Sequence, residues 1–349
     1  MNTKSLEWNQ IKTELKSKQF NWAITGVAGF IGSNLLEFLL LHNQKVIGVD
    51  NFITGKKSNI DEVLKNLSLE QKNNFHFIEE DIRNLDSLKK AFVNVDYVLH
   101  QAALGSVPRS IKTPEISHDH NVNGTMNVFL AAIENKVKQV VFASSSSVYG
   151  DHPKLPKVES EIGKPLSPYA LTKSINEQYA EIFSKTYGLN YIGIRYFNVF
   201  GKRQDSESIY AAVIPLWIDQ LLKNEQPKIF GDGETSRDFC YIENVVKMNI
   251  LSALTTDQMA LNQIYNCACG KKTTLNEVFQ ILKNEIALKF PNVKSISPIY
   301  TEARSGDIRH SLANISKAET NLAYSPEKFF DSGIKEAITW YIASSLEKK

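Results

Sequence analysis

The sequence has little cysteine, and this scarcity excludes the classes of protein that depend on it. Only three cysteines, Cys240, Cys267 and Cys269, occur in 349 residues. Three thiols cannot build a disulfide framework, and the Cys-x-Cys pair lacks a second pair at the spacing of zinc ligands. We therefore expect buried or unreactive thiols in a cytoplasmic protein, and no metal site.

An excess of charge of one sign is also absent. Lys and Arg together number 40 and Asp and Glu 38, which gives a formal net charge of +2. A protein that binds nucleic acid carries a basic surface that neutralises phosphates. The sequence has no such basic stretch, so we expect no nucleic-acid partner.

Long apolar runs are missing as well. The longest, such as residues 35–41, fall well short of the ~20 residues that cross a bilayer, so we expect no membrane segment. Residues 1–20 are polar, with Leu6, Ile11 and Leu15 at helical spacing. This pattern predicts a short helix beside the first strand and not a signal peptide.

The sequence does contain a regular alternation of β-branched runs and helical patterns. The runs lack polar alternation, which is typical of a parallel sheet covered on both faces. Strands are predicted at residues 22–25, 45–49, 75–79, 97–100, 139–143 and 191–196, and helices at 31–41, 85–92, 122–135 and 169–187. The pattern predicts an α/β protein with a Rossmann-type doubly wound parallel sheet.

A glycine-rich turn follows the first predicted strand. Gly26, Gly29 and Gly32 have the spacing that lets a backbone turn sharply and approach a pyrophosphate at the start of the next helix. Asp50 ends the second strand, where a carboxylate accepts from the ribose hydroxyls and repels the extra phosphate of NADP. A helix cap is the alternative role for Asp50, and the nearby Lys56 and Lys57 weaken the exclusion of NADP.

We predict NAD as the cofactor. The residues expected to bind it, besides the catalytic pair described below, follow the first four strands: Gly26, Gly29, Phe30, Ile31, Gly32, Asp50, Asn51, Asp81, Ile82, Gln101, Ala102 and Ala103.

After about residue 200 the alternation fades. Loop signals there mix with helical patterns at residues 211–222, 275–286 and 334–345. We predict an NAD-binding Rossmann domain at residues 1–200, with an N-terminal helix within residues 1–20. Residues 201–349 are predicted to form a smaller C-terminal α/β substrate lobe that is interleaved with this domain.

Tyr169 and Lys173 lie one helical turn apart in a predicted helix. A tyrosine with its usual pKa of about 10 is a poor base at neutral pH. A lysine ammonium beside it, together with the positive nicotinamide ring, would bring that pKa towards the working range. Taken alone, such a pair is common as plain helix surface. Upstream, the run from Ser144 to Ser147 ends a predicted strand and offers a hydroxyl to the substrate, so the combination predicts a catalytic centre.

These motifs together resemble the extended short-chain dehydrogenase/reductases, and within them the UDP-hexose 4-epimerases. The resemblance covers the chain from Trp22 onward and is strongest to the bacterial UDP-GlcNAc/UDP-GalNAc 4-epimerases. Four segments carry it: Ala-Leu-Gly-Ser-Val-Pro-Arg-Ser at 103–110, Arg-Tyr-Phe-Asn-Val-Phe-Gly at 195–201, Gly-Asp-Gly-Glu-Thr-Ser-Arg-Asp-Phe at 231–239 and Arg-Ser-Gly-Asp-Ile-Arg at 304–309.

The resemblance implies an oxidation followed by a reduction at C4 of a UDP-hexose, in the supply of surface polysaccharide precursors. Tyr169 as phenolate removes the 4-hydroxyl proton while NAD takes the C4 hydride, and the 4-ketose turns over before the hydride returns. Four consecutive serines leave the catalytic one open between Ser145, which we prefer, and Ser146. The resemblance also implies a homodimer formed through two helices, at residues 122–135 and 174–187.

Arginines are expected to hold the diphosphate of the UDP-sugar. Arg237 and Arg304 lie in the resembling segments and suit bidentate phosphate contacts. Arg237 could instead pair with its acidic neighbours, and Trp217, a candidate wall for the uracil, could belong to the core. Small residues, Ser305 among them, would leave room for an N-acetyl group at C2. The predicted substrate site comprises Gly105, Ser106, Arg109, Ser145, Ser146, Asn198, Val213, Trp217, Arg237, Arg304, Ser305 and Asp307.

Other substrates and other chemistries remain as alternatives. The same chemistry would serve plain UDP-glucose/UDP-galactose or UDP-glucuronate. A sugar-nucleotide dehydratase would need an Asp-Glu pair beside the serines, and residues 145–148 contain none. A regulatory protein without turnover would have no use for Tyr169, Lys173 and the hydroxyls together.

Overall fold

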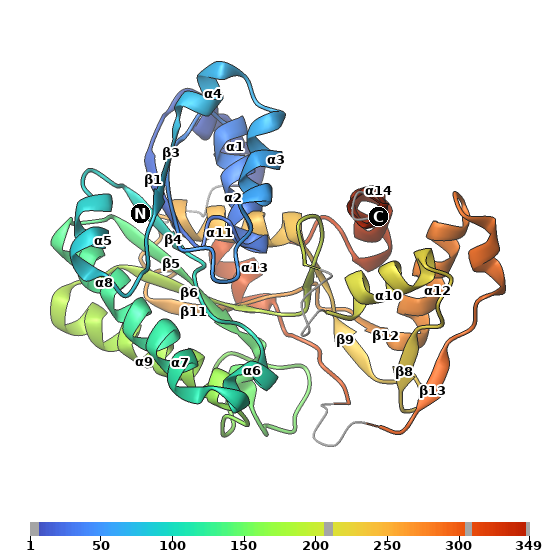
Figure 1. Cartoon of the computed structure of the whole chain (residues 1–349). Coiled ribbons are helices and arrows are strands. Elements are labelled where there is room, and N and C mark those ends of the chain that lie inside the picture. Colours follow the sequence, from blue (N-terminus) through green and yellow to red (C-terminus); the bar gives the residue numbers. More distant parts are fainter. Residues whose placement is uncertain (1–6, 206–211, 304–308, 347–349) are drawn as a thin grey trace.

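Seven parallel strands form the central sheet in the computed structural model, which describes residues 7–205, 212–303 and 309–346 (Figure 1). Their order across the sheet is β11-β6-β5-β4-β1-β2-β3. The strands are β1 (Asn21–Thr25), β2 (Lys45–Asp50), β3 (Phe75–Glu79), β4 (Tyr97–His100), β5 (Gln139–Ser145), β6 (Tyr191–Tyr196) and β11 (Gln263–Cys267). This arrangement confirms the predicted Rossmann-type sheet. The order reverses between β1 and β4, which is where such sheets bind ligands.

The side chains of β1 show how the sheet is buried on both faces. Trp22 and Ile24 point into one core cluster, and Ala23 between them points into the other. The first cluster also contains residues of α1 (Trp8–Ser17), α2 (Phe30–Leu41), α3 (Lys57–Lys65) and α11 (Ile242–Leu254). The second contains residues of α5 (Leu85–Ala91), α8 (Gly124–Glu134) and α9 (Pro168–Tyr187), on the opposite face (Figure 1).

Short elements connect these layers. They are α4 (Leu69–Asn73), α6 (Val107–Lys112), α7 (Pro114–His118), a 3-10 turn at Ser146–Tyr149 and the paired strands β7 (Val199–Phe200) and β10 (Cys240–Tyr241). The helix predicted at residues 122–135 begins differently from the expectation, because Asp119–Asn123 form a π-helical turn before α8. This turn re-aims the side chains of residues 119–123, among them His120.

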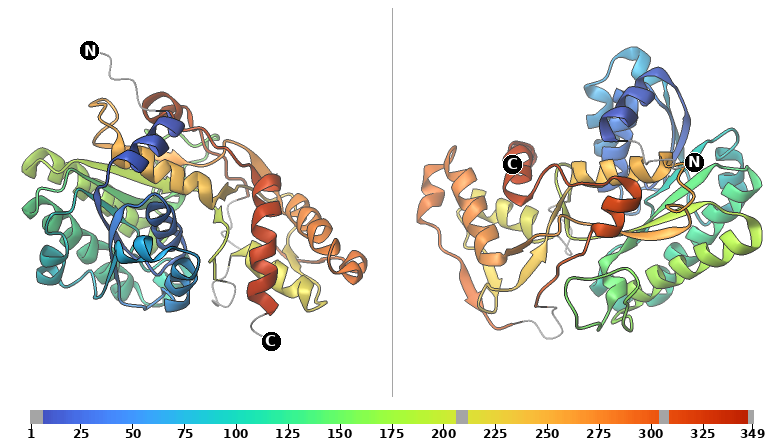
Figure 2. Two further views of the ribbon diagram at one scale, coloured as in Figure 1. Left: turned by 90° about the horizontal axis from the view of Figure 1, so that it is seen from above. Right: turned by 180° about the vertical axis from the view of Figure 1, so that it is seen from behind.

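A second group of elements lies beside the sheet, as the two views of Figure 2 show. It contains α10 (Val213–Leu222), β8 (Lys228–Phe230), β9 (Ser236–Asp238), β12 (Lys272–Thr274), α12 (Leu275–Ala287), a 3-10 turn at Pro291–Ser295, β13 (Ile299–Thr301) and α14 (Phe330–Leu346). β9 pairs with β12 antiparallel and β8 pairs with β13 parallel. The helix predicted from residue 211 begins at Val213, and Ala211 lies outside the described residues.

The chain returns to the central sheet after residue 200. α11 covers one face of the sheet, and β11 pairs with β6 from Gln263 opposite Ile192 to Cys267 opposite Tyr196. α13 (Ser316–Leu322) packs against β11. The sequence pattern does not predict α11, because this helix is buried nearly all round and has no polar face. It does not predict β11 either, because Gln263 and Asn266 interrupt its apolar run. The domain boundary at residue 200 stays a prediction.

Within the described ranges, no helix combines the length and the apolar character that crossing a bilayer requires.

Candidate active site

The glycine turn after β1 lies against the chain that follows β4. Gly26 has φ of +73°, and a Cβ atom there would lie 2.6 Å from the backbone nitrogen of Ala102. A Cβ atom on Gly32 would lie 2.0 Å from the carbonyl oxygen of Gly26. Both positions therefore require glycine. Gly29 is the N-cap of α2, whose first turn carries no acidic side chain, so its positive end is available to an anion.

A cavity of about 330 Å³ opens from this turn along the carboxyl ends of the strands. Thirteen of the fourteen residues predicted to bind NAD line it, and the exception, Asp81, lies behind Asn51. The residues predicted and found there are Gly26, Gly29, Phe30, Ile31, Gly32, Asp50, Asn51, Ile82, Gln101, Ala102, Ala103, Tyr169 and Lys173. Cavity residues that were not predicted include Ile53, Thr54, Gly55, Glu80, Leu104, His120 and Tyr196.

Asp50 is buried at the end of β2 and is held by backbone amides. Its carboxylate accepts hydrogen bonds from the N–H of Ala28 at 2.9 Å and of Phe52 at 2.8 Å. Burial raises the pKa of Asp50, and these amides offset part of that rise. Asp50 does not cap a helix, since the N-cap of α3 is Lys56. Lys56 forms an ion pair with Asp205 at 2.7 Å.

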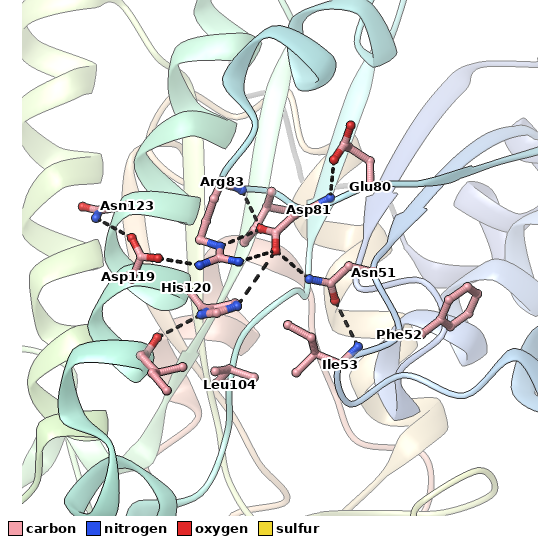
Figure 3. A network of polar contacts seen from close by, with 12 residues as sticks. Asn51, Phe52, Ile53, Glu80, Asp81, Arg83, Leu104, Asp119, His120 and Asn123 are labelled. Carbon is pink, nitrogen blue, oxygen red and sulfur yellow. Dashed lines mark hydrogen bonds and ion pairs between the residues drawn. The ribbon is translucent and has the colours of Figure 1, made fainter.

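Asp81 forms the centre of a polar network at the other end of the cavity (Figure 3). Both its oxygens accept hydrogen bonds from the Arg83 guanidinium, and Asn51 Nδ2 donates to Oδ2 at 2.8 Å. Burial alone would raise the pKa of Asp81, but Arg83 and Asn51 lower it to about 2. The Arg83 guanidinium also forms an ion pair with Asp119, with 2.6 Å between Nη1 and Oδ2. Asp81 thus positions Asn51 at the cavity wall.

Tyr169 and Lys173 face the cavity from the first two turns of α9. The helix begins there because Ser167 caps it, accepting from the Ala170 N–H, and Pro168 occupies the first helical position. Lys173 is 3% exposed, and its Nζ donates to the Ala143 carbonyl at 2.8 Å. The same Nζ lies 6.0 Å from the centre of the Tyr169 ring.

Burial is the main influence on the pKa values of Tyr169 and Lys173. Burial raises the pKa of Tyr169, and a hydrogen bond with Ser145 only partly offsets this rise. Lys173 Nζ donates to the Ala143 carbonyl, and the lowering of the Tyr169 pKa by this ammonium together with the nicotinamide ring stays a prediction. Burial lowers the pKa of Lys173 to about 8, against an opposing effect of Glu177.

The serine run divides into distinct roles. The Ser145 hydroxyl is hydrogen-bonded to the Tyr169 phenol. It also accepts hydrogen bonds from the backbone N–H and the hydroxyl of Ser147. The Ser144 hydroxyl donates to Glu177, which also accepts two hydrogen bonds from Arg195. Ser146 begins the 3-10 turn. Of the two candidate serines, the structure brings Ser145 to Tyr169.

The residues predicted for the substrate are more dispersed. Gly105, Ser106 and Arg109 line an open groove of about 1130 Å³ beside the cofactor cavity. Asn198 donates to the Asp238 carbonyl, and Arg237 Nη1 donates to the carbonyls of Ser236 and Arg309. Among the described residues that line the cavity or the groove, Asn198, Val213, Trp217 and Arg237 do not occur.

Trp217 is 2% exposed and meets the ring of Phe279 edge to face, which favours its alternative role in the core. Val213 is half-buried at the first position of α10. Arg304, Ser305 and Asp307 lie outside the described residues.

Comparison with known proteins identifies the family. The sequence model of the NAD dependent epimerase/dehydratase family matches residues 22–268. The chain belongs to this family. As a family member it uses NAD, and the cavity fits this cofactor: the glycine turn leaves no room for side chains where the pyrophosphate would approach, and Asp50 would accept from the ribose.

Relatives of this family member differ in their named substrates. A Methanocaldococcus jannaschii protein provisionally named UDP-glucose 4-epimerase is 38% identical over 91% of this chain and 97% of its own length. The UDP-glucuronate 4-epimerase of Thermodesulfobacterium geofontis is 33% identical over 91% of this chain and 95% of its own.

A solved structure has a third substrate in its name. The UDP-N-acetylglucosamine 4-epimerase of Methanobrevibacter ruminantium, in complex with UDP-N-acetylmuramic acid, is 40% identical with a TM-score of 0.85. The match covers 94% of this chain and 99% of that one.

Proposed function

We propose that this chain is a UDP-sugar 4-epimerase and that its preferred pair is UDP-GlcNAc and UDP-GalNAc. The observation that carries the reaction class is the arrangement of Tyr169, bonded to Ser145, and Lys173 beside the cofactor cavity. A phenol, a hydroxyl and a buried ammonium are the groups that proton transfer at a sugar hydroxyl requires. The named activities of the relatives support the same reaction class.

Tyr169, Ser145 and Lys173 have different roles in the proposed reaction. Tyr169, as phenolate, takes the proton of the 4-hydroxyl and later returns it to the same oxygen of the inverted sugar. Ser145 donates its single hydroxyl proton in a hydrogen bond to that oxygen when the sugar is bound. Lys173 supplies positive charge that stabilises the phenolate. When bound, NAD supplies the acceptor and donor of the C4 hydride.

The cofactor would be held by the cavity residues. The amides at the start of α2 would face its pyrophosphate, and Asp50 would accept from the adenosine ribose. Asp50 also places a buried carboxylate where NADP carries a phosphate, which favours NAD.

The N-acetylated substrate is supported by small side chains next to the cavity. A 4-ketose that turns over must carry its C2 substituent with it, and an acetamido group needs more room than a hydroxyl. A Cβ atom on Gly105 would meet no atom within 4 Å, so the groove is open at this point. Ser106 adds a second small residue. The 40% identity to a structure named as a UDP-N-acetylglucosamine 4-epimerase supports the same substrate.

The deciding experiment mixes the purified protein with UDP-GlcNAc, UDP-glucose and UDP-glucuronate separately and follows the C4 epimer by chromatography. We expect the highest kcat/KM for the N-acetylated pair. A preference for UDP-glucose or UDP-glucuronate would contradict the substrate but leave the reaction class standing. A 4-keto-6-deoxy product would indicate a dehydratase, and the absence of any product would contradict both.

A further inference from the structure

Three polar side chains at the wall of the cofactor cavity form a closed ring of hydrogen bonds. Asn249 Nδ2 donates to the hydroxyl oxygen of Tyr196 at 2.9 Å. This hydroxyl lies 3.0 Å from Gln101 Oε1 and 3.1 Å from Asn249 Oδ1, and it can donate to either oxygen. Gln101 Nε2 donates to Asn249 Oδ1 at 3.1 Å, which closes the ring. The ring joins the end of β4, the end of β6 and the middle of α11.

The Val245 carbonyl fixes the direction of the ring. Asn249 Nδ2 donates to this carbonyl at 2.8 Å, and because a carbonyl can only accept, the Asn249 amide cannot be turned over. Its Oδ1 must therefore face Gln101. Burial raises the pKa of Tyr196, so the hydroxyl keeps its proton and donates it within the ring.

The ring lies at the end of the cavity where the reaction is proposed. Gln101 and Tyr196 line the cavity, whereas Asn249 is fully buried and is not among the described residues that line it. β4 and β6 flank β5 in the sheet, and Tyr196 lies opposite Ser145 in the register of β5 and β6. Ser145 is in turn hydrogen-bonded to Tyr169. The ring thus spans the strand that carries the serine of the proposed proton transfer.

The part of NAD that exchanges the hydride belongs at this end. The hydride leaves C4 of the sugar while Tyr169 takes the proton of the oxygen on C4, so the nicotinamide ring has to lie near Tyr169. We propose that Asn249 is a positioning residue for the nicotinamide end of the cofactor: through the ring it holds Gln101 and Tyr196 as a wall whose polar groups are already satisfied. The proposal rests on the proposed function in one respect, because it takes Tyr169 to mark the reacting end.

Loss of the Asn249 amide would open this wall. Tyr196 would lose the N–H that it accepts from, and Gln101 Nε2 would lose its acceptor. Polar groups without partners take them from water, so water would occupy this end of the cavity. The nicotinamide ring would have to displace that water, whereas the ADP-ribose part of the cofactor, at the glycine turn and Asp50, would bind as before.

The test compares Asn249→Leu with Asn244→Leu as a matched control. Asn244 is a second buried asparagine on α11, and its side chain is hydrogen-bonded to the backbone of Glu327 and Lys328. Nucleotide-free protein is titrated by calorimetry with NAD and with ADP-ribose, which lacks the nicotinamide ring. We expect Asn249→Leu to lose about three- to tenfold in affinity for NAD and little for ADP-ribose. Asn244→Leu should change the two affinities by the same factor or not at all.

Tyr196→Phe breaks the same ring and leaves Asn249 in place, so it should show the same selective loss. The double variant should lose no more than Asn249→Leu alone, because the ring acts as a unit. Losses that add up would overturn the proposal, as would unchanged NAD binding or equal losses for both nucleotides in Asn249→Leu. If Asn249→Leu fails to fold, the selective loss in Tyr196→Phe decides. Absence of turnover with every UDP-sugar would contradict the proposed function alone, because these affinities are measured without substrate.

Discussion

At the scale of single residues, the question is which serine hydroxyl assists Tyr169 in proton transfer at the sugar. Ser145 is hydrogen-bonded to the Tyr169 phenol, whereas Ser146 is the first residue of the 3-10 turn that follows. We expect Ser145→Ala to lower kcat by about 10²-fold, and Ser146→Ala to lower it far less. Tyr169→Phe should cost at least as much as Ser145→Ala while binding of the UDP-sugar is retained. Steady-state kinetics measures kcat of the three variants, and calorimetry measures their binding of the UDP-sugar. A larger loss of kcat in Ser146→Ala than in Ser145→Ala would assign the catalytic role to Ser146.

Glu177 acts on the site through the charge of Lys173. It raises the pKa of Lys173, which burial lowers to about 8. Removing the negative charge in Glu177→Gln should therefore lower this pKa further, so that activity is lost at a lower alkaline pH. The buried Arg195, no longer paired with a carboxylate, acts in the same direction. The alkaline limb of kcat against pH measures the shift.

Ser144→Ala is the matched control for Glu177→Gln. It removes another hydrogen bond to the same carboxylate but leaves its charge in place. Its alkaline limb should stay at the wild-type position, and an equal shift in both variants would mean that local structure and not charge is responsible.

Single residues also mark the limit of sequence reasoning. Asp50 and Tyr169 were predictable because strand ends and helical spacing place them. His120 and Leu104 were not, because a π-helical turn orients His120 and two backbone hydrogen bonds with the Asn121 side chain hold Leu104. Neither contact leaves a local pattern in the sequence. Trp217 shows the opposite case, in which a candidate ligand contact lies in the core.

At the scale of elements, the glycine turn between β1 and α2 allows a sharp test of packing. A Cβ atom on Gly32 would lie 2.0 Å from the Gly26 carbonyl oxygen, whereas on Gly29 the distance to the same oxygen would be 3.2 Å. Gly32→Ala should lower the free energy of unfolding by about 3 kcal/mol or more and abolish NAD binding. Gly29→Ala should cost about 1 kcal/mol or less. Denaturant unfolding with and without NAD compares the two variants. Similar losses of unfolding free energy in both would show that the backbone of the turn can shift to make room for a methyl group.

The elements that escaped prediction share one physical cause. Six strands were found because apolar, β-branched runs are interrupted by turns. β11 and α11 were missed because burial among other elements, and not amphipathic patterning, determines them. Lys247, Asn244 and Asn249 are all buried on α11. Their hydrogen bonds and the ion pair of Lys247 with Glu327 satisfy them there, so polar residues do not mark a surface on this helix.

At the scale of the whole molecule, the predicted homodimer concerns the outer face of α9. Leu171, Tyr179 and Ile182 are exposed on this helix. If a second copy covers them, Ile182→Glu should convert a dimer into a monomer, because a charge would be buried against apolar side chains. Light scattering during size-exclusion chromatography measures the mass. Leu69→Glu on α4 introduces the same charge at another exposed leucine and should leave the mass unchanged. A monomeric wild type would contradict the prediction.

The pairing of β11 with β6 has a consequence for any attempt to separate the two lobes. A polypeptide shortened to residues 1–200 would keep six strands but leave the N–H and C=O groups of Tyr191–Tyr196 without their neighbour on one side. Such an open, apolar sheet edge recruits further copies. We expect the shortened polypeptide to precipitate, whereas one in which residues 240–268 follow residue 200 through a short linker should precipitate less, which sedimentation would show. Residues 240–268 belong to the central sheet, although residues of the substrate lobe precede and follow them. An exchange of substrate lobes between relatives would therefore need one junction before and one after residues 240–268. A single junction near residue 200 would leave β6 exposed and cause aggregation.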